Sequence, residues 1–394
     1  MSARRGVIVT GGGTAGHVLP AIAIAEALVE HGRPREAVRY VGARRGMERR
    51  LVPESGFPLT LLPGRGVERR VSRAAFDALV ELAAGIVRAV ILLGQSPPEV
   101  VVSVGGYAGL PASLAALVWS IPLVVVNIDA IPGAANRLAG RFAKASAVAL
   151  AGTPLPRATL TGAPVRSEVA ALRRSATTRE RTRRALDIAP DAFVIVVAGG
   201  SLGARRLNEA GLALARRWAD QDRMLLYHVT GEREHARVLG ARPEVEAEKG
   251  LDYRVVGYEA RLAEVLCAAD VAICRAGAST IAELCVIGTP SLLVPLPGAP
   301  SDHQRHNAER LQAAGAAWVV ADDEATGERL GAMVESLRAD PARRAAMEQA
   351  ALSLGQPDAA RRIASLVEEV AQRPRGGLKA RPTRRTAGAT RQEG

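Results

Sequence analysis

The hydrophobic pattern of the chain alternates short β-branched runs with longer amphipathic stretches. In the first half, such runs lie at 7–10, 38–42, 100–104, 123–126 and 147–150. The pattern starts again in the second half, with runs at 194–198, 224–229, 253–256, 271–274, 291–295 and 317–320. Strand and helix repetition of this kind predicts right-handed crossovers and a parallel sheet in each half. We therefore expect an α/β fold with two Rossmann-like domains that face each other across a cleft.

The break between the two repeats predicts the domain organisation. The pattern stops at TGAPVR, residues 161–166, and an arginine-rich stretch follows it. We expect a first domain over residues 1–163 and a second over residues 164–355. A last amphipathic helix over 356–372 precedes the C-terminal tail, residues 373–394.

The basic charge of the chain is concentrated in this tail. Lys and Arg outnumber Asp and Glu by 52 to 40, and residues 373–394 contribute +6 of the net charge of +12. The tail has no apolar periodicity, so we expect it to be disordered. It is either a solvated extension or an electrostatic anchor for anionic lipid or nucleic acid. Because no aromatic residues interleave its charges, we expect no nucleic acid partner.

The amino-acid composition limits the classes of protein to which the chain can belong. Apolar residues make up 48% of the chain and aromatic residues only 3%, which is typical of helices packed on a buried parallel sheet. The sequence contains no uninterrupted apolar run of about 18 residues and no signal-peptide core, so we expect a soluble, cytoplasmic protein. Cys267, Cys274 and Cys285 lie in apolar segments without a CxxC spacing. They are expected to be buried free thiols, and no metal framework is visible.

A glycine-rich turn follows the first predicted strand and opens a helix. Gly11, Gly13 and Gly16 satisfy the spacing GxGxxG, which aims free backbone N–H groups at an anion and predicts phosphate binding. A dinucleotide enzyme would need an acid at the end of the second strand, but that strand is followed by Arg44 and Arg45. An NADP-dependent oxidoreductase therefore stays open as an alternative, whereas NAD use is largely excluded.

Two further motifs in the second half favour a nucleotide sugar as ligand. The turn at 199–204, GGSLGA, repeats the strand, glycine and helix order, and Ser201 adds a hydroxyl donor to its amides. Glu283 lies early in a helix after the glycine-containing turn at 275–279, where a carboxylate can accept both ribose hydroxyls. Gln304 and Asn307, three residues apart at a helix start, can bind sugar hydroxyls without charge.

Six ordered motifs resemble the MurG family of glycosyltransferases. They are GGGTAGH at 11–17, GGYAGLP at 105–111, GAPVR at 162–166, GGSLGA at 199–204, CRAGASTIAE at 274–283 and DHQRHNA at 302–308. The resemblance covers roughly residues 5–370 and implies a GT-B fold in which the last helix returns to the first domain. It further implies inverting transfer of N-acetylglucosamine from UDP-N-acetylglucosamine to undecaprenyl-pyrophosphoryl-N-acetylmuramoyl-pentapeptide, on the cytoplasmic face of the cell membrane, with no cofactor and no metal.

The resemblance also implies roles for individual residues. Those on the acceptor side are Gly13, Thr14, His17, Tyr107 and Asn136. Those on the donor side are Arg166, Gly200, Ser201, Glu283, Gln304 and Asn307.

The chain departs from the family pattern near the reacting sugars. The family usually reads HEQN where this chain has Val126, Asn127, Ile128 and Asp129. His17 and Asp129 are both candidates for the general base that takes the proton of the acceptor hydroxyl.

The one Asp-x-Asp pair in the sequence, Asp220 and Asp222, falls in a polar turn. We expect it to lie on the surface rather than to form a metal site.

Residues 65–93 combine a basic rim with apolar side chains. Arg65, Arg69, Arg70, Arg73 and Arg88 surround apolar residues from Val71 to Leu92. This pattern indicates either docking on an anionic membrane surface or an ordinary core-facing helix, and both can hold for different turns of the segment.

Within glycosyltransferases, transfer of a sugar from UDP to another membrane lipid such as diacylglycerol is the alternative function.

Overall fold

Seven parallel strands form the sheet of the first domain in this computed structural model, which describes residues 6–65, 73–200, 203–243 and 250–373. The strand order is β3-β2-β1-β4-β5-β6-β7, with β4 at the centre. The strands are β1 Val7–Thr10, β2 Val38–Ala43, β3 Leu59–Leu62, β4 Val100–Ser103, β5 Leu123–Asn127, β6 Ala145–Val148 and β7 Ala158–Leu160. Every recorded strand pair is parallel, as the crossover pattern predicts.

The second domain repeats this arrangement with six parallel strands. Its order is β10-β9-β8-β11-β12-β13. The strands are β8 Phe193–Ala198, β9 Met224–Val229, β10 Asp252–Val256, β11 Val271–Cys274, β12 Ser291–Leu293 and β13 Ala317–Val319. In both sheets the order reverses beside the first strand of the domain, which is where α/β proteins of this type bind ligands.

Helices cover both faces of each sheet, because alternate strand residues point to opposite sides. In β1, Val7 and Val9 join one core cluster, whereas Ile8 joins the other. The helices of the first domain are α1 Ala15–Glu30, α2 Glu48–Glu54, α3 Arg73–Gln95, α4 Gly106–Val118 and α5 Ala134–Gly140. Those of the second are α6 Ser167–Ala170, α7 Ala176–Ala185, α8 Arg205–Arg217, α9 Glu232–Gly240, α10 Leu262–Ala268, α11 Ala278–Ile287, α12 His303–Ala313, α13 Gly327–Ala339 and α14 Pro341–Leu354.

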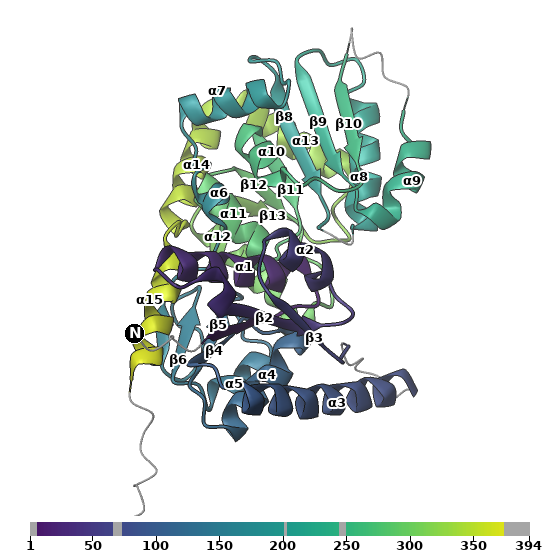
Figure 1. Ribbon diagram of the computed structural model, residues 1–394. Helices are drawn as coiled ribbons and strands as arrows, with labels where there is room; N and C mark the ends of the chain where they lie inside the picture. The colour runs from purple at the N-terminus through teal and green to yellow at the C-terminus, as the bar shows by residue number, and fades with distance from the viewer. Residues whose placement is uncertain (1–5, 66–72, 201–202, 244–249, 374–394) are drawn as a thin grey trace, which may run out of the picture.

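The last helix, α15 Ala359–Gln372, returns to the first domain. Its apolar residues Ile363 and Val367 share a core cluster with β1 and α1, and Figure 1 shows it beside the first sheet. The buried guanidinium of Arg33, at the end of α1, pairs with Glu368 of α15 and with Glu99, 2.8 Å away. This buried pairing joins α15 to the first domain.

The two domains meet through loops at the carboxyl ends of their sheets. Ser279 Oγ, at the start of α11, donates to the carbonyl of Gly16 in α1 at 2.9 Å. The side chain of Asn307 in α12 reaches the loop after β5. Residues of the sequence motifs therefore lie at one interface, although they come from both halves of the chain.

The sequence analysis missed two strands, β3 and β7, which form the edges of the first sheet. Both are short, and every residue of β7 is exposed, so neither shows the buried apolar pattern of a central strand. The expected boundary at 163/164 falls in the loop between β7 and α6. Residues 374–394 of the tail lie outside the described residues. The three cysteines are free and buried, as predicted.

Candidate active site

The glycine-containing turns after β1 and β4 pack closely against each other near the start of α1. Gly13 has a φ of +96°, and a Cβ at this position would lie 2.5 Å from the Tyr107 ring. Gly106 has a φ of +72°, and a Cβ there would lie 2.4 Å from the carbonyl oxygen of Gly12. Both positions therefore require glycine for conformation and for space. The turns after β1 and β4 thus form one unit, which places Tyr107 beside Gly13 as the resemblance implies.

A buried carboxylate that the sequence analysis missed holds this unit together. Glu48, at the start of α2, is fully buried, and its Oε1 accepts hydrogen bonds from Gly13 N at 3.1 Å and Ala43 N at 3.2 Å. Its Oε2 has no partner among the described residues. Because Glu48 occupies the Gly13 amide, the proposed acceptor contact of Gly13 is not made by a free N–H group here. Burial and the Glu48 charge both raise the pKa of Tyr107, whose hydroxyl donates to the Arg45 carbonyl.

His17 lies in the first turn of α1, half-buried at the domain interface. Burial lowers the pKa of its imidazole; the Asp129 carboxylate opposes this shift, and His303 at the start of α12 adds to it. The ring is therefore neutral near pH 7 and can accept a proton. The exposed Thr14 is the N-cap residue of α1, and its Oγ1 lies 3.4 Å from His17 Nδ1.

Asp129 follows β5 in the segment that departs from the family pattern. Its backbone carbonyl accepts a hydrogen bond from Asn127 Nδ2 at 2.7 Å, and its Oδ1 accepts one from Asn307 Nδ2 at 3.1 Å. Asn136, predicted on the acceptor side, is buried below this loop and donates to Val126 O and Asn127 Oδ1, both at 3.1 Å. Asn136 therefore supports the loop in this structure, and its contact with acceptor stays a prediction.

The donor-side residues from α12 hold loops of the protein. Gln304 Oε1 accepts a hydrogen bond from Leu296 N at 3.0 Å, which fixes the segment after β12. Asn307 is buried, and both its amide nitrogen and its oxygen bond to protein groups. Their contacts with sugar hydroxyls stay predictions.

Glu283 of α11 and Arg166, which precedes α6, interact electrostatically. Burial raises the pKa of Glu283 to about 7, while the Arg166 guanidinium opposes the shift and Glu168 adds to it. Arg166 also pairs with Glu168, and its Nε is buried without a partner among the described residues. Gly200 has a φ of +85° with open space around it, so its backbone is accessible to a ligand. Ser201 lies outside the described residues.

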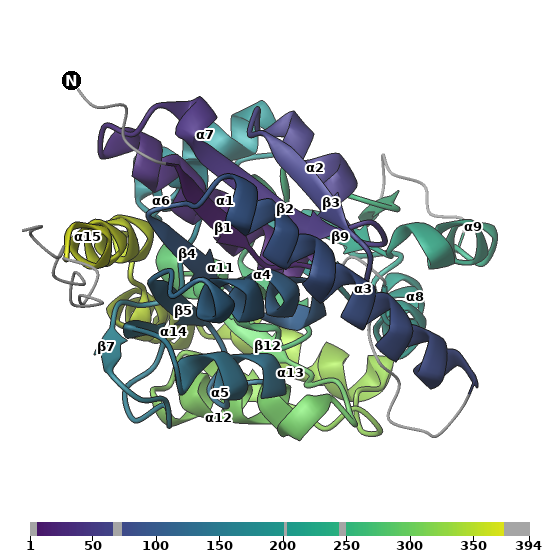
Figure 2. The same ribbon diagram turned by 60° about the horizontal axis from the view of Figure 1, so that its bottom comes forward.

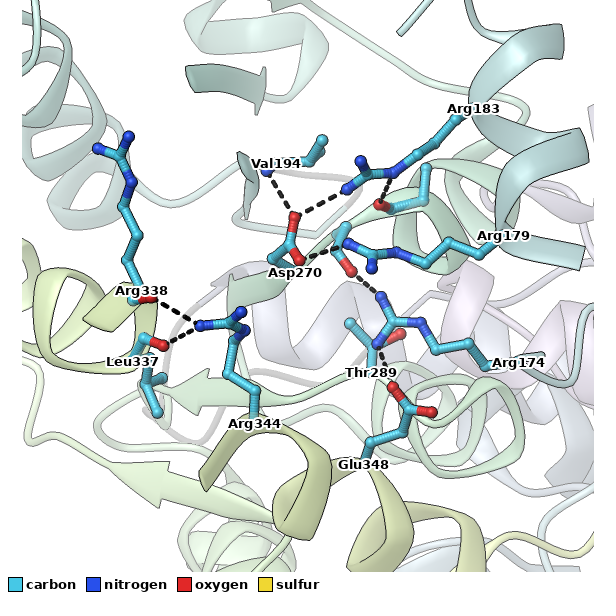
Figure 3. Close-up of polar contacts among 12 residues, drawn as sticks. Arg174, Arg179, Arg183, Val194, Asp270, Thr289, Leu337, Arg338, Arg344 and Glu348 are labelled. Atoms are coloured by element: carbon cyan, nitrogen blue, oxygen red, sulfur yellow. Dashed lines mark hydrogen bonds and ion pairs between the residues drawn. The ribbon is translucent and has the colours of Figure 1, made fainter. Parts of the chain in front are cut away.

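The arginine-rich stretch around α7 is structural. Asp270 accepts hydrogen bonds from Val194 N and Arg183 and pairs with Arg179, and Arg174 binds Glu348 of α14 (Figure 3). A cavity of about 770 Å³ beside this cluster lies at the amino ends of β8, β9 and β10, away from the interface. Because Arg183 is already bonded to carboxylate and carbonyl groups, we assign this cluster to stability.

No group of three or more potential metal ligands occurs among the residues that the structure describes. Asp220 and Asp222 are exposed in the turn before β9, as predicted. None of the helices described is both long and apolar enough to span a lipid bilayer.

Comparison with known proteins identifies the family of the chain. The UDP-N-acetylglucosamine–N-acetylmuramyl-(pentapeptide) pyrophosphoryl-undecaprenol N-acetylglucosamine transferases of Desulforudis audaxviator and Acidothermus cellulolyticus are each 39% identical to the chain, and each alignment covers 93% of the chain and 98% of the relative. The sequence also matches the glycosyltransferase family 28 N-terminal domain over 7–148 and the C-terminal domain over 194–363. The chain belongs to the MurG family within glycosyltransferase family 28.

A solved structure of this family has the same fold. The crystal structure of Acinetobacter baumannii MurG matches with a TM-score of 0.70 at 26% identity, covering 93% of this chain and 99% of that one. The predicted GT-B fold with two Rossmann-like domains is thereby confirmed, and so is the predicted membership of the MurG family.

Proposed function

We propose that this MurG-family enzyme transfers N-acetylglucosamine from UDP-N-acetylglucosamine to the 4-hydroxyl group of undecaprenyl-pyrophosphoryl-N-acetylmuramoyl-pentapeptide. The observation that carries the proposal is the identity of 39% with transferases named for this reaction, over nearly their whole length. Two features of the structure support the proposal: the imidazole of His17 in the first domain has a lowered pKa and the buried carboxyl group of Glu283 in the second has a raised one, and Ser279 of α11, the helix that carries Glu283, donates to Gly16, the residue before His17. Membership of a glycosyltransferase family disfavours the oxidoreductase alternative.

His17 is the better candidate for the general base. The acceptor hydroxyl oxygen attacks the anomeric carbon, the bond from that carbon to UDP breaks, and the hydroxyl proton passes to the base. Burial keeps His17 neutral, so it can accept this proton, and the nearby Asp129 charge stabilises the imidazolium that forms. Inversion at the anomeric carbon follows from a single displacement.

The leaving UDP acquires negative charge that the second domain can stabilise. The start of α8 offers the positive end of the helix dipole, and Gly200 before it has open space around its backbone. Arg166 contributes a guanidinium near Glu283, and we assign to the Glu283 carboxylate the role of accepting the ribose hydroxyls. These donors supply the electrostatic stabilisation that the reaction needs without a step through a metal ion.

The acceptor identity is tested by giving the purified enzyme one donor and two acceptors. With UDP-N-acetylglucosamine, the lipid-linked muramoyl-pentapeptide should be glycosylated, whereas diacylglycerol should not. Transfer to diacylglycerol alone would refute the proposed acceptor and favour the alternative function.

We also propose that α3 docks the enzyme on the cytoplasmic face of the membrane. Ala89 and Leu93 of this helix are buried in the core, whereas Phe76 is 66% exposed and Val87 58%. Further exposed apolar residues of α3 are Leu79, Val80 and Ile91. Figures 1 and 2 show α3 along the side of the first domain that faces away from the second.

Neighbouring helix ends extend this apolar surface. Trp119, which follows α4, is half exposed, and its Nε1 donates to the Val90 carbonyl at 2.8 Å. Phe142 and Lys144 line a small pocket with Leu117 at the same end of the domain. The exposed cations Arg88 and Lys144 complement anionic headgroups. Arg69 and Arg70 lie outside the described residues.

Vesicle sedimentation tests this surface. Val80→Asp should weaken binding to anionic phospholipid vesicles, because it places a charge in the apolar surface. Leu239→Asp is the control, since Leu239 is 43% exposed on α9 of the second domain. If Val80→Asp and Leu239→Asp bound the vesicles equally well, the assignment of α3 as the membrane-docking surface would be refuted.

A further inference from the structure

The side chain of Asn307 bridges the two domains. Its Nδ2 donates to Asp129 Oδ1 of the first domain at 3.1 Å and to the Ala276 carbonyl of the second at 3.2 Å. Its Oδ1 accepts from Ala130 N at 2.9 Å. Both N–H groups are thereby engaged, and the side chain is only 3% exposed. In this arrangement Asn307 is occupied by the protein rather than offered to a ligand.

We propose, resting on the function proposed above, that Asn307 is a positioning residue that holds the Asp129 carboxylate toward His17. The second domain, which also carries the donor-binding residues, then completes the pair of His17 and Asp129 in the first domain. Assembly of the base is thereby tied to the relative placement of the two domains.

The contacts of Asp129 support this assignment. Within the described part of the chain, Asn307 is the one side chain that donates to the Asp129 carboxylate. The Asn127 amide fixes the backbone of Asp129 but not its carboxylate. Without Asn307, the half-buried carboxylate is free to turn toward solvent.

A second contact places His17 itself. Ser279 Oγ donates to the Gly16 carbonyl at 2.9 Å, so the residue before His17 is bonded to the start of α11. The charged and titratable groups that act on the pKa of His17 are Asp129, from the loop after β5, which raises it, and His303, at the start of α12, which lowers it. His17 and its anionic neighbour are therefore both held by the second domain, through different residues.

Two substitutions separate the charge of Asp129 from its placement. Asp129→Asn keeps an oxygen that can accept from Asn307 but removes the negative charge. Asn307→Ala keeps the charge but removes the bridge. Arg305→Ala is the matched control, because Arg305 is exposed on the same helix and pairs with Asp302 and Glu309.

The pH profile of kcat/KM distinguishes positioning from mere structural support. Loss of the Asp129 charge lowers the pKa of His17, so the acidic limb should move to lower pH in Asp129→Asn, and kcat should fall. Asn307→Ala should move the limb in the same direction, and the double variant should move it no further than Asp129→Asn alone. Arg305→Ala should retain the wild-type profile.

An NMR titration of the His17 ring gives a readout that does not need turnover, with the signal assigned by its loss in His17→Ala. The pKa of His17 should fall in Asn307→Ala, or in the similarly sized Asn307→Leu if the alanine variant does not fold. An unchanged His17 pKa and acidic limb in the Asn307 variants, or additive shifts in the double variant, would overturn the proposal. Absence of transfer by the wild type, with the NMR shift present, would instead refute the proposed function.

Discussion

Donor affinity should depend on the ionisation of Glu283. Burial raises the pKa of this carboxyl group to about 7, so it is only partly ionised near neutral pH. An ionised carboxylate can accept hydrogen bonds from both ribose hydroxyls, whereas a protonated one loses part of this capacity. UDP should therefore bind more weakly as the pH falls below 7.

The expected size of the effect follows from the pKa. A group with a pKa of about 7 is roughly 90% ionised at pH 8 and roughly 10% at pH 6, so the dissociation constant of UDP should rise about tenfold, or ~1.4 kcal/mol, between these values. Glu283→Gln removes the charge and keeps the shape. It should weaken UDP binding at pH 8 by ~1.5–3 kcal/mol, because a hydrogen-bond acceptor loses its charge.

Isothermal titration calorimetry with UDP at pH 6, 7 and 8 measures both effects. The phosphate of UDP itself titrates near pH 6, so the slope of Glu283→Gln is subtracted from that of the wild type. Glu180→Gln is the control, since Glu180 is an exposed acid on α7. Equal affinities of wild type and Glu283→Gln at pH 8, or equal slopes with pH, would refute the role assigned to Glu283.

Four further outcomes are expected. His17→Ala should lower the turnover number by roughly 10²-fold with little change in melting temperature or UDP affinity, and early unfolding or near-normal turnover would indicate a merely structural histidine. Burial lowers the pKa of His228 from 6.5 to about 4, so the protein should lose up to ~3 kcal/mol of stability as the pH falls through this range, measured by urea unfolding, with a flatter slope in His228→Gln. Asp270→Asn leaves the buried Arg183 without its charge partner and should cost ~3–5 kcal/mol, whereas Glu180→Ala at an exposed pair should change stability by less than ~1 kcal/mol. Turnover should persist in excess chelator; loss of activity that magnesium or manganese restores would contradict the proposed stabilisation of the leaving group.

The sequence patterns predicted the glycine turns but not what holds them. Gly13 stands out because glycine punctuates a strand-to-helix turn, whereas Gly106 entered only within the motif GGYAGLP that carries the family resemblance. Glu48 does not, because a single acid at a helix start is usually solvated, and only the fold shows the Gly13 and Ala43 amides around it. A signal was present in GARRGME, residues 42–48, where the acid follows one glycine at the end of a strand and a second glycine in the turn after it.

Contacts between domains were the least predictable part of the site. Asn307 and Asp129 lie 178 positions apart, and no periodicity relates them. Considered alone, each residue type fits another role: Asn307 can bind sugar hydroxyls, and Asp129 can act as the general base. The bridge between them depends on how the two domains are placed, which is set by packing such as that of α15 on α1 rather than by local pattern.

The most direct measurement of the central claim is the structure of the product. The enzyme is incubated with UDP-N-acetylglucosamine and the lipid-linked muramoyl-pentapeptide, and the new linkage is determined by NMR. We predict a single N-acetylglucosamine on the 4-hydroxyl group of the muramoyl sugar, with the configuration at its anomeric carbon inverted relative to the donor. An unmodified acceptor, a different position of attachment or retained configuration would contradict the account.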